Sequence, residues 1–413
     1  MHASDTVWVL VSAALVLFMI PGLGLFYAGM VRSKGVLSII VQSLLVMAVV
    51  TVCWAVLAFS LVYGHDAGGG LIGNLSFVGL AHLNATLPGF GRHLMVPPEA
   101  VMVFQLMFAA ITAALVTGAI VDRIRIVALV PLIIAWLFVV YVPLAHWVFS
   151  PGGWLAHLGV LDFAGGTVVE INSGFSALAL ALVIGRRHGW PRDAMLPHSL
   201  PLTMLGAGIL WFGWFGFNAG SALAINTNAL HAFVNTQLAA ATGMLGWLAF
   251  ELARRRVATG LGAASGAVAG MVAITPCAGY VGPMPALLIG AIAGFLSVSA
   301  VQLKFRFGYD DSLDVLGIHG VGGLVGMVLL GLFAERSATG GASGLLLGGG
   351  VHLFGLEVLA AVVSAAYAFG ATYLLARGIN RVCPLRVSLN DELEGLDVTQ
   401  HGEHAYAPTS PAR

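Results

Sequence analysis

The chain has 413 residues, of which 59% are hydrophobic and only 9% are charged, and its formal net charge is zero. Soluble domains carry about 25% charged residues, so this composition excludes an ordinary soluble protein and predicts a polytopic membrane protein. The zero net charge indicates neither an acidic nor a basic partner, and we expect no nucleic-acid partner. The three cysteines, Cys53, Cys277 and Cys383, lack the spacing of a metal site or a disulfide framework.

Eleven apolar stretches are long enough to span a bilayer, so the chain is predicted to be all-α with eleven transmembrane helices. The first follows an N-terminus without the basic region of a signal peptide, so we expect it to be retained. The predicted spans cover about residues 7–31, 36–63, 100–121, 126–149, 165–185, 200–219, 228–253, 260–278, 284–303, 315–334 and 350–376.

Basic residues predict the orientation of these spans, because cytoplasmic connections carry an excess of Lys and Arg. One set of connections carries only Arg92 and Arg336. The alternate set carries Arg32, Lys34, Arg123, Arg125, Arg186, Arg187, Arg192, Arg254, Arg255, Arg256, Lys304 and Arg306. The N-terminus is therefore predicted outside and the C-terminus inside, which agrees with an odd number of spans. We divide the chain into a transmembrane domain (1–377) and a polar cytoplasmic tail (378–413) that is predicted to be a docking segment.

Two short segments resemble each other across the chain. Residues 25–30 (LFYAGM) in the first span resemble residues 216–221 (GFNAGS) in the sixth. These two spans run in opposite directions, which is typical of an inverted repeat of five plus five helices, about 7–185 and 200–334, followed by a last helix. Transporters built this way bind substrate at the repeat interface, near the middle of the bilayer.

Glu170 in the fifth span and His319 in the tenth occupy matching places in the two halves, each among small residues. An ionisable residue in a membrane helix is costly and usually functional. A pseudo-two-fold axis would bring the two side chains together, and a carboxylate and an imidazole can share a proton. The alternative is a buried ion pair that only fixes helix packing.

Other polar and aromatic residues allow a structural and a functional interpretation. Asp162 begins the fifth span, where it can cap free backbone N–H groups and also favour a nearby cation. Ser221 could supply a hydrogen-bond acceptor for such a cation. Aromatic side chains toward the external ends form either an ordinary interfacial belt or a cation–π site; they are Phe104, Phe108, Trp147, Phe149, Trp214 and Phe217.

The remaining acidic residues are predicted to be structural. Asp310, Asp311 and Asp314 precede the tenth span, and we expect Asp314 to be the most buried of the three. Glu251 and Glu357 lie near helix ends and are expected to reach the interface. Phosphate-binding loops, metal-ligand spacings and nucleophile motifs are missing from the sequence, so we expect no enzyme activity, no cofactor and no metal.

Taken together, these motifs resemble the ammonium transporter (Amt/Mep/Rh) family over about residues 7–406. The resemblance is carried by residues 21–32 (PGLGLFYAGMVR), 162–169 (DFAGGTVV), 213–221 (GWFGFNAGS), 273–276 (AITP), 310–320 (DDSLDVLGIHG) and 394–397 (EGLD). It implies an eleven-helix protomer with its own pore, assembled as a homotrimer in the plasma (cell inner) membrane. A PII-type regulator at the tail is a further implied partner.

The resemblance also assigns roles to residues. It implies an external ammonium site at Phe108, Phe149 and Ser221 with Trp214 nearby, and a phenyl gate formed by Phe108 and Phe217. Its structurally essential aspartate falls on Asp162. Of the family's two pore histidines only the second is present, as His319.

Two positions depart from the family pattern. Glu170 stands at the first histidine position, as in some members that include fungal ones. Phe149 replaces the usual Trp, and Phe is the weaker cation–π partner.

The expected function is uptake of ammonium, with methylammonium as an analogue. Ammonium would bind at the external aromatic site and lose its proton there. Ammonia would then cross an apolar pore while Glu170 and His319 relay the proton, which makes net transport electrogenic. Two alternatives remain: a passive channel for ammonia or carbon dioxide, and an ammonium sensor that signals through its tail.

Overall fold

The computed structural model describes residues 2–83, 86–90, 94 and 96–406. Within these ranges the protein is helical, and its only β contacts are two isolated bridges, Asp66–Gly73 and Ile124–Arg386. Arg92, which the orientation argument counted among the external basic residues, lies outside the described residues.

The first half of the chain forms five long helical segments, three of which contain a π-helical turn. They are α1 (Ala3–Met30); α2 (Val36–Cys53) continued by η1 (Trp54–Ala58) and α3 (Phe59–Tyr63); α4 (Pro98–Thr117); α5 (Ile126–Trp136) continued by η4 (Leu137–Tyr141) and α6 (Val142–Phe149); and η5 (Gly166–Ile171) continued by α8 (Asn172–Ile184). Two short turns, η2 (Val78–Leu80) and α7 (Trp154–Leu158), lie in the connections.

The second half contains five more long helical segments and a long final helix. Its long segments are α9 (Leu200–Gly220), α10 (Thr227–Arg255), α11 (Gly260–Ile274), α12 (Pro283–Phe307), η6 (Leu316–Gly320) continued by α13 (Val321–Phe333), and α15 (Val351–Val382). The short elements are α14 (Arg336–Thr339), η7 (Leu345–Leu347), α16 (Leu389–Glu394) and α17 (Leu396–His401).

Each predicted span overlaps a long helix, and the all-helical membrane class is confirmed. Nine segments in the described ranges are long and apolar enough to cross a bilayer by length and composition. The two predicted spans outside this set are α10, which is more polar, and α11, which is short but apolar. The count of eleven crossings and the orientation of the termini therefore stay predictions.

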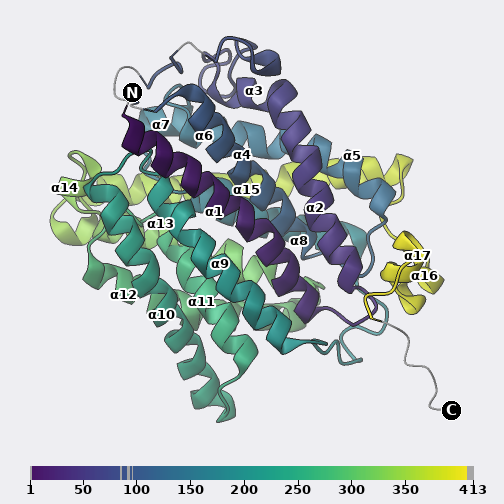
Figure 1. Ribbon diagram of the computed structural model, residues 1–413. Helices are drawn as coiled ribbons and strands as arrows, with labels where there is room; N and C mark the ends of the chain where they lie inside the picture. The colour runs from purple at the N-terminus through teal and green to yellow at the C-terminus, as the bar shows by residue number, and fades with distance from the viewer. Residues whose placement is uncertain (1, 84–85, 91–93, 95, 407–413) are drawn as a thin grey trace.

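Helices α1 and α9, the first of each predicted repeat, lie side by side across the middle of the molecule (Figure 1). Small residues allow this approach. A Cβ atom at Gly206 would lie 2.2 Å from the backbone nitrogen of Phe26, and one at Gly29 would lie 2.5 Å from the backbone nitrogen of Thr203. Glycines at such positions let two backbones pack closely where lipid supplies no hydrophobic driving force.

The tail folds against the helix ends near α2 (Figure 1). The Asp397 carboxylate accepts a hydrogen bond from the backbone N–H of Ser38 at 2.8 Å, and Lys34 donates to the carbonyl of Leu393. Glu392 accepts from the backbone N–H of His188 at 2.6 Å. The tail therefore touches connections from two parts of the helical bundle.

Two predictions about acidic residues are wrong. Asp314 is the least buried of its cluster: Arg123 and Arg187 hold Asp310 inside, and Asp311 accepts from the backbone N–H of Leu316. Glu251 and Glu357 do not reach the interface: both are buried, and each accepts backbone N–H groups from a neighbouring connection, at Thr259 and Leu161 respectively.

Candidate substrate pathway

Two phenyl rings from different halves of the chain close the centre of the bundle. Phe108 of α4 and Phe217 of α9 stack with ring centroids 4.2 Å apart and an interplanar angle of 11°. Both side chains are fully buried, at 0% and 1% exposure. Stacked rings at this separation leave no room for a hydrated ion between them.

The other residues predicted for the external site gather next to this stack. Phe149, at the end of α6, meets Phe108 edge-on at 6.3 Å between ring centroids, and it is half-buried. Ser221 ends α9 and its hydroxyl donates to the Phe217 carbonyl at 2.8 Å, which leaves the oxygen lone pairs free to accept. Both side chains are half-buried, and each adjoins one ring of the fully buried stack.

Trp214 lies beside the gate but offers no donor to a substrate. Its ring is 5.7 Å from that of Phe217 and is 3% exposed. Its indole N–H donates to the Thr275 hydroxyl at 3.0 Å, and that hydroxyl in turn donates to the Met271 carbonyl. Trp214 therefore forms a fixed wall, and Thr275 is a supporting residue that the sequence did not single out.

Asp162 holds the start of the η5–α8 segment. Its carboxylate accepts from the backbone N–H groups of Gly165, Gly166 and Thr167 at 2.6–2.8 Å, and from the Thr167 hydroxyl at 2.5 Å. Gly165 has φ +111°, a conformation that L side chains rarely adopt. Asp162 therefore forms the predicted cap. It fixes the backbone of residues 165–167, shortly before Glu170 in the chain.

Glu170 and His319 meet, as the internal symmetry predicted. Nδ1 of His319 and Oε2 of Glu170 are 2.7 Å apart, with exposures of 4% and 1%. The second carboxylate oxygen of Glu170 has no hydrogen-bond partner among the described residues. The pair is compact and buried, and it keeps one carboxylate oxygen free to accept a hydrogen bond within the described structure, which suits a group that binds and releases a proton.

Both members of this pair lie on π-helical turns, Glu170 in η5 and His319 in η6. Each turn leads into an α-helix of 13 residues, α8 in the first half and α13 in the second. Single π-turns are rare and are often found at functional sites. Hydropathy does not distinguish a π-turn from an α-turn, so the sequence could not show this feature.

Glycines permit the approach of the two turns. A Cβ atom at Gly174 would lie 2.3 Å from the backbone of Gly320, directly after His319. A Cβ atom at Gly323 would lie 2.9 Å from the Cβ atom of Glu170. Any side chain at these positions would push η5 and η6 apart and lengthen the contact between Glu170 and His319.

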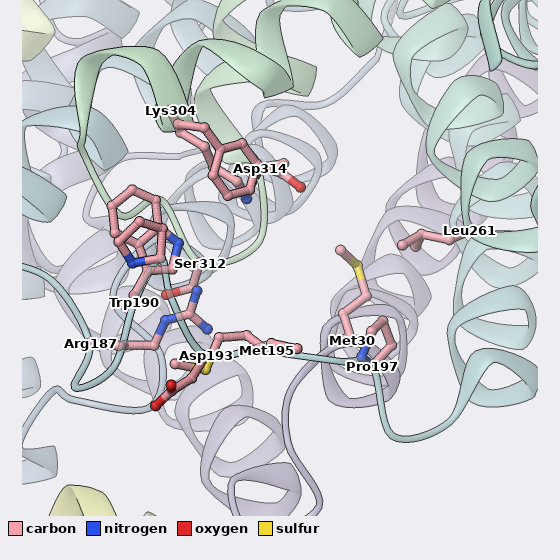
Figure 2. A pocket seen from close by; sticks show the side chains of 13 residues that line it. Met30, Arg187, Trp190, Asp193, Met195, Pro197, Leu261, Lys304, Ser312 and Asp314 are labelled. Atoms are coloured by element: carbon pink, nitrogen blue, oxygen red, sulfur yellow. Dashed lines mark hydrogen bonds and ion pairs between the residues drawn. The ribbon is translucent and has the colours of Figure 1, made fainter. Parts of the chain in front are cut away.

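A polar cavity of about 250 Å³ lies at the end of the bundle that carries the predicted cytoplasmic connections. Figure 2 shows Lys304 beside Asp314, with Arg187 and Asp193 lower in the view and Met30 and Pro197 to the right. The Lys304 ammonium donates to Asp314 at 2.5 Å. Asp314 lies two residues before η6, the turn that carries His319.

Charged residues behind the cavity link several connections. Arg187 donates to Asp310 at 2.8 and 2.9 Å, and the fully buried Arg123 donates to the Asp310 carbonyl at 2.6 Å. Burial alone would raise the pKa of Asp310, but the hydrogen bonds from Arg187 and the charges of Arg123 and Arg187 lower it. Burial and the nearby charge of Asp314 raise the pKa of Asp311 to about 6.

Comparisons with known proteins agree with this geometry. The model of the Ammonium Transporter Family matches residues 7–406. An ammonium transporter of Mycobacterium tuberculosis is 46% identical, with 97% of this chain and 90% of the relative covered. Ammonium transporter Amt1 of Archaeoglobus fulgidus is 42% identical, with 98% and 100% covered.

Solved structures of Mep2 and Amt proteins also match the fold of this chain. Mep2 of Saccharomyces cerevisiae superimposes with a TM-score of 0.88 at 35% identity, covering 94% of this chain and 88% of Mep2. A protein described as a sensor Amt protein also reaches a TM-score of 0.88, at 30% identity, covering 96% and 98%.

Proposed function

Because the chain belongs to the ammonium transporter family, we propose that it takes up ammonium electrogenically, by separating ammonium into ammonia and a proton inside the membrane. The observation that carries this proposal is the buried pair of Glu170 and His319 close to a closed phenyl gate. Potassium resembles ammonium in charge and size, but it has no proton to give up. A path that demands deprotonation therefore discriminates between the two ions.

The first step is recruitment at the external aromatic site. The half-buried face of Phe149 attracts a cation, and the Ser221 oxygen accepts a hydrogen bond from it. Asp162 adds a negative charge near this site while it caps the segment before Glu170. Phe108 forms the floor, and Trp214 keeps the Phe217 ring in place.

The second step separates the proton from ammonia at the gate. A shift of the Phe108 and Phe217 rings admits a small neutral molecule more easily than a hydrated ion, because desolvating a charge there is costly. Oε1 of Glu170, which has no partner among the described residues, accepts this proton while Oε2 gives its own proton to the free Nδ1 of His319 across the 2.7 Å contact, so the carboxyl group passes one proton on and stays protonated. Ammonia crosses past His319 toward the cavity lined by Asp314 and Lys304.

The proposal also includes the membrane topology, the assembly and the tail of the protein. The chain crosses the plasma (cell inner) membrane eleven times, with the N-terminus outside and the C-terminus inside, and it assembles as a homotrimer. Residues 1–377 form the transporter and residues 378–413 the tail, which offers a PII-type regulator a docking surface. The five-plus-five inverted repeat is supported by the matching π-turns η5 and η6.

A second candidate function is ammonium sensing through the tail. Two observations favour it: the tail is folded against the connections near Ser38 and His188, and one similar structure is described as a sensor Amt protein. Growth of a transporter-deficient host on low ammonium separates the two functions, because uptake restores growth and sensing alone does not.

Solid-supported-membrane electrophysiology tests the proposed transport. Wild-type proteoliposomes should give a current with ammonium and methylammonium and none with potassium. Glu170→Gln removes the carboxyl group that accepts and passes on the proton, and it should lower the ammonium current by about tenfold or more, with an altered pH profile.

The matched control is Glu251→Gln, which changes a buried glutamate that is bound to Thr259 instead of lying on the pathway. It should leave the current unchanged. An unchanged methylammonium current in Glu170→Gln between pH 5 and 8 would remove Glu170 from the relay. A wild-type protein that accumulates ammonia without any current would instead be a passive gas channel.

A further inference from the structure

A small pocket lies between the last turns of α8 and α15. It has a volume of about 170 Å³, and it is lined by Leu182, Val183, Tyr373, Arg377, Asn380 and Arg381. None of these residues belongs to the proposed pathway. The hydroxyl groups of Ser176 and Thr372, which are 2.9 Å apart, join the two helices just before the pocket. The pocket is therefore bordered by two helices that are fixed to each other.

Every polar side chain that lines this pocket has a hydrogen-bond donor to offer. Arg377 donates to the Tyr373 hydroxyl at 3.0 Å, and the hydrogen of that hydroxyl stays free to donate. The side-chain oxygen of Asn380 accepts from the backbone N–H of Leu385 at 2.9 Å, which leaves the amide NH₂ group as a donor. An arginine side chain has donors only, and the lining contains no carboxylate. The pocket therefore suits an anion.

Two positive charges at the pocket have no counter-ion among the described residues. Arg377 and Arg381 are exposed and lie four residues apart on α15, so their side chains share one face of the helix. The next arginine along the chain, Arg386, is paired with Glu392 at 2.7 Å, whereas neither of the two forms an ion pair within the part that the structure describes. Guanidinium groups bind phosphate strongly, because two parallel N–H groups match two phosphate oxygens.

The apolar stretches of both helices end at this pocket. The predicted span of α15 ends directly before Arg377, and α8 ends at Ile184. Leu182 in the pocket lining is 48% exposed, and Leu374 next to Tyr373 is 72% exposed. Exposed leucines followed by exposed arginines are expected where lipid chains give way to headgroups. Arginines at a helix end indicate only orientation by themselves, but these two border a pocket whose other polar groups are donors as well.

We infer that this pocket binds the phosphate of an anionic phospholipid, with Arg377 and Arg381 as the main ligands and the acyl chains beside Leu182 and Leu374. The inference goes beyond the proposed function, and only the choice of the cytoplasmic leaflet rests on the proposed topology. A headgroup with a net negative charge matches the two arginines. A zwitterionic headgroup would bring its own cation next to them and is therefore bound less tightly.

A lipid in this position touches both α8 and α15 and should stabilise the protein. Ligands that bind only the folded state raise the melting temperature according to their affinity. The contact also bears on the pathway helix, because α8 continues η5, the turn that carries Glu170. Lipid binding can nevertheless be measured without transport, so its failure and the failure of the proposed function are separate results.

The test compares two lipids and two sets of arginines. Native mass spectrometry of the purified assembly in detergent gives the affinity for phosphatidylglycerol and for phosphatidylcholine with the same acyl chains, and thermal unfolding is measured with each lipid. The variants are Arg377→Gln, Arg381→Gln and the double change. Arg306→Gln is the matched control: this exposed arginine ends α12 and lies 5.9 Å from the ring of Phe307, as Arg377 lies 5.7 Å from that of Tyr373, but it is outside the pocket.

The wild type should bind phosphatidylglycerol more tightly than phosphatidylcholine and melt at a higher temperature in its presence. Each single variant should weaken phosphatidylglycerol binding by about fivefold and the double variant by about 25-fold, as expected for one or two basic residues near a membrane surface. Arg306→Gln should leave the affinity unchanged. Replacing both arginines by Lys keeps the charge but loses the paired N–H groups, and should give an intermediate affinity.

Equal binding of the two lipids by the wild type would overturn the inference, and so would an unchanged affinity in the double variant. If Arg306→Gln weakens binding as much as Arg377→Gln, the attraction comes from overall charge and the pocket has no role. Inorganic phosphate identifies the source of the anion: a rise in melting temperature with phosphate alone, lost in the double variant, would show a site for a soluble anion in place of a lipid. Should the double Gln variant melt below the wild type without lipid, the Lys variant decides the result.

Discussion

Phe149 is the residue at which we expect the simplest departure from the family pattern, because the family resemblance implies an indole where this chain has a benzene ring. Trp is the strongest aromatic partner for a cation, and the gain at an exposed site is about 0.5–1 kcal/mol. Phe149 is half-buried, and its ring tip is 3.3 Å from the position that a Cβ atom on Gly165 would take. A larger ring must therefore extend toward the open side, where the cation is proposed to bind.

Phe149→Trp is expected to lower the half-saturation concentration for ammonium by about threefold, because the indole offers a stronger cation–π surface. The maximal current should stay the same, since the gate and the Glu170–His319 pair are untouched. Ammonium titrations of transport current provide the measurement, and Phe149→Leu, which removes the π face, should move half-saturation the other way. Equal affinities for the Trp and Leu variants would rule out a cation–π contribution.

The single side chain of Asp311 is expected to make the stability of the folded protein depend on pH. Its carboxyl is 1% exposed, and one of its oxygens has no hydrogen-bond partner among the described residues. Its pKa is raised to about 6 by burial and by Asp314, whereas an unfolded chain has about 3.9. The folded state therefore binds a proton more tightly than the unfolded state, and stability falls as the pH rises from about 4 to 6.

Asp311→Asn removes this titration and keeps an oxygen to accept from the backbone N–H of Leu316. The variant should gain stability over the wild type as the pH rises from 4.5 to 7.5, by up to about 3 kcal/mol at the upper end, because each pKa unit corresponds to about 1.4 kcal/mol. Thermal unfolding of the purified protein in detergent at both pH values measures the difference. A gain that is larger at pH 4.5 would contradict the raised pKa.

At the scale of elements, the geometry of the pathway depends on how closely η5 and η6 approach. The contact of Gly174 with Gly320 sets this distance, and both glycines lie within a turn of the ionisable pair. This contact holds together two distant segments, whose ionisable residues Glu170 and His319 are 149 residues apart in sequence.

Gly174→Ala is expected to disrupt this contact, because its Cβ atom would lie 2.3 Å from the backbone of Gly320, where no side chain can move aside. Overpacking of this kind typically costs about 1–3 kcal/mol, so both the melting temperature and the ammonium current should fall. Gly355→Ala is the matched control. It adds the same methyl group to helix α15, where no atom lies within 4 Å of the new Cβ atom. The ammonium current should stay unchanged, and the stability of the protein should stay equal or rise, because Ala favours a helix more than Gly does. A Gly174→Ala protein with wild-type current and stability would show that the two turns can separate without consequence.

The elements also show where sequence reasoning succeeds and where it stops. Hydropathy found every long helix, because apolar length is a property of local sequence. The internal symmetry predicted that Glu170 and His319 would meet. The π-turns and the contact of Gly174 with Gly320 were not predictable, since both arise from packing between distant segments. Glu357 was misjudged for the same reason: its partner, the backbone N–H of Leu161, lies far away in sequence.

At the scale of the whole molecule, α1 and α9 join the two halves along their length, while η5 and η6 meet between them. The predicted repeat explains why single residues from each half make up the gate and the pair: Phe108 with Phe217, and Glu170 with His319. A site shared in this way requires both halves to fold before any pathway exists. The tail touches the connections near Ser38 and His188, at the same end of the bundle as the polar cavity.

The buried phenyl stack has an electrical consequence. In the proposed cycle a proton crosses the apolar barrier formed by Phe108 and Phe217, whose side chains are 0% and 1% exposed. An apolar barrier does not conduct ions, so membrane voltage falls across it, and a unit charge that crosses the full potential gains or loses about 2.3 kcal/mol per 100 mV. The proposed relay is therefore expected to respond to the resting voltage of the cell.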